Sequence, residues 1–211
     1  MGADLTIESN YSAALELLDL ERFIDYILIN FYAGNADWAF QNWNASYNRK
    51  DPEQNWVFHN WDAEKTFQQV NDDVTDANDK GSPTWIHQRL RKNSEYRLKF
   101  ADRVHHLMFN DGVLTPESAS SIYASRLMEI DRAIVAESAR WGDNRNPDNA
   151  PYTRETWVNE SARLLSEFFP ERTGVLLAQL KNHSLYPTFG APALSQYGGN
   201  VESDFMLKFD N

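Results

Sequence analysis

Three polar side chains in the first third of the chain have the chemistry of a reaction centre. Asp37 follows an apolar segment closely, Asn42 comes five residues later, and Asp62 ends a segment rich in aromatic residues. Carboxylate and amide oxygens are ligands that Mg²⁺ prefers, and a carboxylate can also accept a proton from a reacting hydroxyl. If the chain brings the three together, the pattern predicts a magnesium site beside a general base.

The segments around these residues predict how they are positioned. Apolar residues between Ser12 and Asn30 recur every three to four positions, which predicts a buried helix beginning near Leu20, after Asp19 as N-cap, or as early as Ser12. Residues 37–47 have no helical period and predict a loop running into a strand. Turn residues at 48–53 and a second aromatic strand at 56–61 complete a hairpin, with Asp62 at its far end.

Helix, Asp-x-x-x-x-Asn loop, hairpin and Asp follow one another in the order that protein kinases use. There they place a catalytic base, a metal-binding Asn and a metal-binding Asp. Two other interpretations stay open from the residues alone. In the first, Asp37 and Asn42 only cap a turn; in the second, Asp37, Asp62 and Glu64 among neighbouring tryptophans supply the acid/base pair of a sugar-cleaving site.

The rest of the chain is predicted to be mainly helical. A polar loop with Val74 as its only apolar anchor, expected to be mobile, covers residues 71–83. Helices follow at 84–91, 94–109, from Thr115 as N-cap to about 141, and from 153 to about 182 with an interruption at Phe169-Pro170. The predicted fold class is therefore mainly α with a small β-hairpin (α+β).

The last segment, residues 187–211, differs in composition from the helical region, residues 1–186. It contains Pro187, Gly190, Pro192, Gly198 and Gly199 and then weak apolar alternation from Val201 to Phe209. This predicts a linker leading into a strand without a partner, and hence into a following β domain. We accordingly expect the chain to be a section of a larger protein.

Composition excludes several classes of function. The 211 residues hold 20 Lys and Arg against 31 Asp and Glu, a net charge of −11, which offers no general attraction to nucleic acid. The absence of cysteine removes disulfides and thiolate chemistry and leaves the compartment open. No apolar run is long enough for membrane insertion.

Several segments resemble one known family. They are Leu18 to Tyr26, Asn30 to Trp38, Trp56 to Glu64, Phe100 to Val104 and Glu129 to Ile134. Together they are similar to the C-terminal part of the spore coat CotH kinase family over roughly residues 10–186. The most specific pieces are Asn35-x-Asp37-Trp38 and Trp61-Asp62-x-Glu64.

The resemblance implies the large C-terminal lobe of a divergent, atypical protein kinase. Its members transfer phosphate from ATP to protein Ser with Mg²⁺ or Mn²⁺, so Asp37 would match the catalytic Asp, and Asn42 and Asp62 the metal-binding residues. It also implies a protein substrate or partner, a bacterial source, and a secreted or cell-envelope multidomain parent.

The departures from the kinase pattern limit what this chain is expected to do alone. It contains no Gly-x-Gly-x-x-Gly, Asn35-Ala36 replaces the usual His-Arg before Asp37, and Lys50 and Lys65 are expected to be ordinary solvated lysines. We therefore expect little activity from this chain alone; the alternative is a non-catalytic binding or scaffolding module. A carboxylate cluster of Asp37, Asp62 and Glu64 is expected to need a cation between its members.

Overall fold

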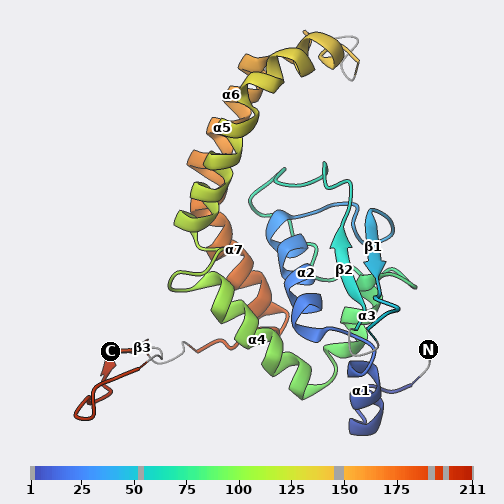
Figure 1. Cartoon of the computed structure of the whole chain (residues 1–211), viewed down its shortest axis with the longest axis vertical. Coiled ribbons are helices and arrows are strands. Elements are labelled where there is room, and N and C mark those ends of the chain that lie inside the picture. The colour runs from blue at the N-terminus through green and yellow to red at the C-terminus, as the bar shows by residue number, and fades with distance from the viewer. Residues whose placement is uncertain (1–2, 52–54, 145–149, 190–192, 197–199, 211) are drawn as a thin grey trace.

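The computed structural model describes residues 3–51, 55–144, 150–189, 193–196 and 200–210. In chain order the elements are α1 (Glu8–Leu15), α2 (Leu20–Ala33), β1 (Trp43–Ser46), β2 (Val57–Asn60), α3 (Pro83–Leu90), α4 (Ser94–Met108), α5 (Pro116–Trp141), α6 (Arg154–Arg163), a π-helical turn (Leu164–Phe168), α7 (Phe169–Asn182), β3 (Ala193–Leu194) and β4 (Phe209–Asp210). Figure 1 shows a helical body with the hairpin on one side and a long helical arm rising from it. The predicted mainly α fold with a small hairpin is confirmed.

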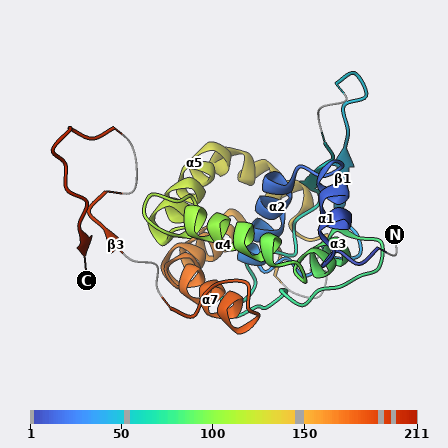
Figure 2. The same ribbon diagram turned by 90° about the horizontal axis from the view of Figure 1, so that it is seen from below.

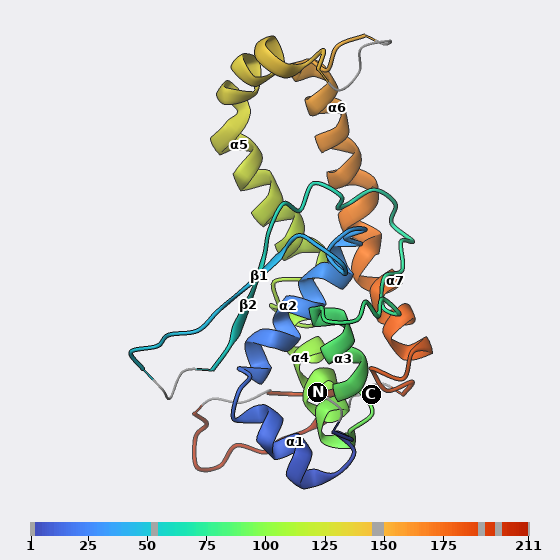
Figure 3. The same ribbon diagram turned by 90° about the vertical axis from the view of Figure 1, so that its right-hand side faces the viewer.

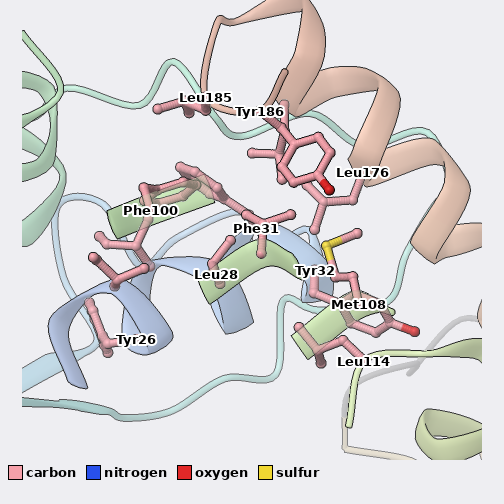
Figure 4. Close-up of a cluster of buried hydrophobic side chains, with 14 of the residues drawn as sticks. Tyr26, Leu28, Phe31, Tyr32, Phe100, Met108, Leu114, Leu176, Leu185 and Tyr186 are labelled. Atoms are coloured by element: carbon pink, nitrogen blue, oxygen red, sulfur yellow. The ribbon is translucent and has the colours of Figure 1, made fainter. Parts of the chain in front are cut away.

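The central helix of the body is α2. The Asp19 carboxylate accepts the Arg22 backbone N–H (3.1 Å), which confirms the predicted N-cap, and the stretch before it forms a separate helix, α1. Gly34 ends α2 in the left-handed region (φ 58°), where a Cβ would lie 3.0 Å from the Cβ of Asp72. Figure 4 shows Phe31 of α2 among apolar side chains of α4 and α7, including Phe100 and Leu176.

The hairpin forms where the sequence predicts it and packs on α2. Strands β1 and β2 are antiparallel, with Trp43 opposite Asn60 and Ser46 opposite Val57. The Phe58 ring lies 5.2 Å from that of Phe23 on α2, measured between centroids. Residues 52–54 of the predicted turn lie outside the described residues.

The buried guanidinium of Arg172 joins α7 to the end of α2. It donates to the backbone carbonyls of Tyr32 (2.7 Å), Val70 (2.6 Å) and Phe31. The carbonyls at the end of a helix lack partners within the helix, so an arginine can satisfy them. This contact also fixes the start of the polar loop that follows the hairpin.

Distant polar side chains contact the polar loop, for which we expected Val74 to be the only apolar anchor. Gln88 donates to the carbonyls of Thr75 (2.9 Å) and Ala77 (3.2 Å). The His183 ring lies 3.0 Å from Asp76 and 3.4 Å from Asp73, through its two nitrogens. The expectation considered only apolar anchors, whereas these contacts are polar and come from α3 and from the residue that follows α7.

The arm consists of α5 and of α6 with its continuation into α7 (Figure 3). Helix α5 has the predicted limits, because the Thr115 hydroxyl accepts the Ser118 N–H (3.3 Å) and Pro116 occupies the first turn. The predicted interruption near Pro170 takes the form of the π-helical turn, after which Pro170 lies in the first turn of α7. Within the described ranges, no helix is both long and apolar enough to cross a membrane.

The tail differs from the prediction. Strands β3 and β4 are two residues long and pair with each other, so the strand expected at 201–209 is reduced to Phe209, and it has a partner. The Ser195 N–H donates to the Lys208 carbonyl (2.9 Å), which extends this contact by a residue. Seen from below in Figure 2, the tail lies to one side of the helical body. That residues 187–211 lead to another domain stays a prediction.

Candidate active site

Asp37 lies in the loop that leaves α2. Its side chain is buried, with 8% of the residue exposed. Two backbone hydrogen bonds pin the loop to the chain beyond the hairpin: the Ala36 N–H donates to the Lys65 carbonyl (3.0 Å) and the Phe67 N–H to the Ala33 carbonyl (2.8 Å). The segment that leads into Asp37 is therefore held against residues 65–67.

Hydrogen-bonded asparagine side chains support this loop. Asn35 donates to the side chain of Asn30 (2.9 Å), and Asn30 donates to the side chain of Asn60 (2.7 Å) and to the Tyr26 carbonyl (2.8 Å). The Asn35 side-chain oxygen accepts the Asp37 N–H (3.3 Å). The network connects α2, the Asp37 loop and β2, and the sequence analysis missed it.

Asn42 contacts Asp37 directly. Its side-chain amide donates to Oδ2 of Asp37 (3.0 Å), which directs the amide nitrogen toward the carboxylate and leaves the amide oxygen for a cation. The backbone carbonyl of Asn42 accepts the N–H of Trp61 (3.2 Å). This bond fixes the end of β2, and with it the backbone of Asp62, beside Asn42.

Asp62 is exposed, unlike Asp37. Asn42 and Asp62 both have left-handed backbone conformations, with φ of 58° and 49°. Non-glycine residues adopt this region uncommonly, and Asn and Asp are the residues that tolerate it best. Asn42, which contacts the buried Asp37 carboxylate, thus has the kind of backbone conformation that collects at functional sites.

The second carboxylate oxygen of Asp37 is an unsatisfied buried acceptor. Oδ1 is buried and has no hydrogen-bond partner in the described part of the chain. The ring of the next residue, Trp38, is buried, 5.8 Å from Tyr26 and 5.9 Å from Phe31 between centroids. Burial raises the pKa of Tyr26, which packs against Trp38. A proton acceptor held in a rigid, largely apolar setting fits a general base.

The expected cluster of three carboxylates is absent. In the described residues, no group of three or more His, Asp or Glu is arranged to hold a metal ion. The reason is that Asp37 is buried against Asn42, whereas Asp62 and Glu64 are exposed beyond β2. Asn42 and Asp62 are too few ligands for Mg²⁺ by themselves. Mg²⁺ is often held by one or two side chains together with nucleotide phosphate oxygens, and such oxygens would have to complete its coordination here.

The aromatic residues near the site divide into two groups. Trp38 is in the core and Trp43 packs on Phe58 at 6.0 Å between centroids, whereas Trp56 and Trp61 are exposed at 43% and 64%. The four tryptophans are therefore partly core, and they do not form one continuous surface for a ligand.

The comparison with family models shows the family of the chain. The model described as CotH kinase protein matches residues 3–176, which include Asp37, Asn42 and Asp62. The chain belongs to the CotH kinase protein family. No curated protein and no solved structure matches it. The resemblance based on Asn-x-Asp-Trp and Trp-Asp-x-Glu is thus confirmed, and the matched residues include the hairpin, α5, α6 and the first part of α7.

Proposed function

We propose that this CotH domain is the large lobe of a protein kinase that phosphorylates Ser on a protein substrate. In this proposal Asp37 is the general base, and Asn42 and Asp62 hold Mg²⁺ or Mn²⁺ together with the phosphates of ATP. The observation that carries it is the hydrogen bond of 3.0 Å between Asn42 and Asp37, with Asp62 following a residue bonded to the Asn42 backbone.

Each group has a separate role in the proposed reaction. Asn42 orients the Asp37 carboxylate, which accepts the proton of the substrate hydroxyl as the serine oxygen bonds to the terminal phosphorus and ADP leaves. The cation supplies positive charge at the phosphates when bound. Because phosphoryl transfer depends mainly on positioning and charge, the rigid asparagine network beneath the loop supports catalysis.

This chain supplies only part of the positioning apparatus. It contains no Gly-x-Gly-x-x-Gly to cover the phosphates, so we propose that the 211 residues by themselves turn over little ATP. We further propose that the domain acts within a secreted or cell-envelope protein of a bacterium. These features rest on the family's known properties.

Isothermal titration of the whole chain with a non-hydrolysable ATP analogue tests the proposal. We expect binding that requires Mg²⁺ and that weakens at least tenfold in Asp62→Asn, because one ligand charge is lost. Glu64→Gln is the matched control, since it removes an exposed carboxylate two residues away and should leave the affinity unchanged.

One result would favour the alternative. If the analogue binds equally well to wild-type protein and Asp62→Asn, the metal roles of Asn42 and Asp62 are wrong. The domain would then be better described as a non-catalytic binding or scaffolding module that keeps the family fold.

A further inference from the structure

A cavity with apolar walls lies between the N-terminal segment, α1, the hairpin and α3. It measures about 460 Å³, and most of its lining side chains are aliphatic or aromatic, among them Leu18, Phe58 and Leu90. Figure 1 shows these elements next to one another, on the side of the body that carries the hairpin. Protein interiors leave few voids larger than a water molecule, so an apolar cavity of this size has the dimensions of a small-molecule site.

The cavity has a buried floor and an open mouth. Leu18 and Leu90 are only 9% and 1% exposed, whereas Leu17 and Trp56 line the same cavity and are 64% and 43% exposed. The buried residues form the floor, and the exposed ones mark the mouth. A ligand can therefore enter from solvent past Leu17 and Trp56 and contact the apolar core.

Hydrogen bonds hold the walls of the cavity in place. The Trp56 N–H donates to the Leu17 carbonyl (2.9 Å), and the Asp19 N–H donates to the Trp56 carbonyl (3.2 Å), which fixes the mouth. The Asn93 side chain donates to the Leu5 carbonyl (2.9 Å), which joins the N-terminal segment to the start of α4. The cavity is thus largely preformed, as small-molecule sites usually are.

Arg89 is the one charged residue that lines the cavity within the described part of the chain. Its guanidinium lies 4.9 Å from the centre of the Trp85 ring and donates to the Ala3 carbonyl. It forms no ion pair with a carboxylate of the described residues, and Asp4, beside Ala3, instead accepts the Thr6 N–H (3.0 Å). A guanidinium has five N–H donors, so Arg89 keeps donors for an anionic group of a ligand.

We propose that this cavity binds a fatty acid, with the alkyl chain among the apolar side chains and the carboxylate on Arg89. A carboxylate matches the fork of a guanidinium, and the apolar walls offer no partner for a second polar group, so the ligand has a single polar end. An alkyl chain of about ten carbons is a ligand of the size that such a cavity holds. None of Asp37, Asn42 and Asp62 lines the cavity, so the proposal does not depend on the proposed kinase activity.

Isothermal titration of the whole chain with decanoate, below the concentration at which decanoate forms micelles, tests the proposal. We expect one decanoate to bind per chain. Octanoate should bind about 15-fold more weakly, because each buried methylene changes the affinity about fourfold. Decanol has the same alkyl chain without the charge, and it should bind at least tenfold more weakly than decanoate, because the hydrogen bond between charged groups is lost.

Variants of the lining residues locate the ligand. Arg89→Met keeps an apolar stem and removes the charge, so it should bind decanoate no better than decanol. Ile86→Trp places a larger ring in the cavity and should weaken decanoate binding at least tenfold without changing the circular dichroism spectrum. Arg132→Met removes an exposed arginine of α5, and as the matched control it should bind decanoate like the wild-type chain.

Several results would overturn the proposal. The first is equal binding of decanoate and decanol to the wild-type chain, a comparison that does not depend on the folding of any variant. Binding of several decanoate molecules per chain, or full affinity in a folded Ile86→Trp chain, would show that decanoate binds elsewhere. A chain that binds vesicles of phosphatidylglycerol but not decanoate would show that the apolar residues at the mouth contact a membrane instead.

Discussion

His87 should make the folded domain sensitive to acid. The residue lies in α3 inside a cluster of aromatic rings, 5.5 Å from Phe31 and 5.4 Å from Phe100 between centroids. Its Nδ1 lies 2.8 Å from the Tyr96 hydroxyl, and Nε2 is buried without a partner in the part of the chain that is described. Burial, and to a lesser extent the nearby Arg91, lower the pKa of His87 from 6.5 to about 3.

The sign of the effect follows from this lowered pKa. Below pH 6.5 the unfolded chain takes up a proton at His87 that the folded chain does not, so the free energy of unfolding falls as the pH falls. The loss continues down to a pH of about 3, and above pH 6.5 the residue has no such effect. At about 1.36 kcal/mol per pH unit, the cost at pH 5 is about 2 kcal/mol. For a domain of this size that corresponds to a melting temperature lower by about 4–8 °C.

The assay is the melting temperature of wild-type protein and two variants between pH 7.5 and 5. His87→Phe should be less stable at pH 7.5, because the Tyr96 hydroxyl loses its partner, but should lose about 2 kcal/mol less on acidification. His106→Gln, which removes an exposed histidine, should keep the wild-type pH dependence. If His87→Phe and wild type show the same acid-induced loss, the reasoning from the lowered pKa is refuted.

Three further predictions concern other contacts. Arg172→Met should lower the free energy of unfolding by about 3 kcal/mol or more in urea, because three backbone carbonyls lose a charged donor; a loss under about 1 kcal/mol would contradict this. Asp37→Asn should leave the melting temperature unchanged or raise it, since Oδ1 is buried without a partner in the described residues, and a fall of several degrees would mean that Asp37 is chiefly structural. His183→Gln should speed amide hydrogen exchange in residues 71–79, and an unchanged rate would show that its contacts with Asp73 and Asp76 do not hold the loop.

The elements that were predicted correctly are specified by residues close together in the sequence. Thr115 and Pro116 specify the start of α5, and Asp19 that of α2, because capping depends on residues within one turn. The hairpin followed from aromatic segments on both sides of a polar turn. Asp37 and Asn42 were singled out because their loop lies between the helix and the hairpin, and their hydrogen bond itself was not predicted.

The features that escaped prediction depend on residues far apart in the sequence. Arg172 contacts carbonyls about 140 residues away, and no local sequence pattern predicts such a contact. The tail was mispredicted because two short strands pair only with each other. One signal was present and unused: Asn30 interrupts the apolar face of α2, and a buried amide there requires polar partners, which turned out to be Asn35 and Asn60.

The most direct test of the proposed metal roles of Asn42 and Asp62 is the position of a bound cation. Crystals of the chain grown with Mn²⁺ and a non-hydrolysable ATP analogue would locate the ion by its anomalous scattering. We predict one Mn²⁺ within about 2.3 Å of both the Asn42 amide oxygen and the Asp62 carboxylate, with phosphate oxygens completing its coordination. A nucleotide bound with its metal elsewhere, or an ion that contacts neither residue, would contradict the account.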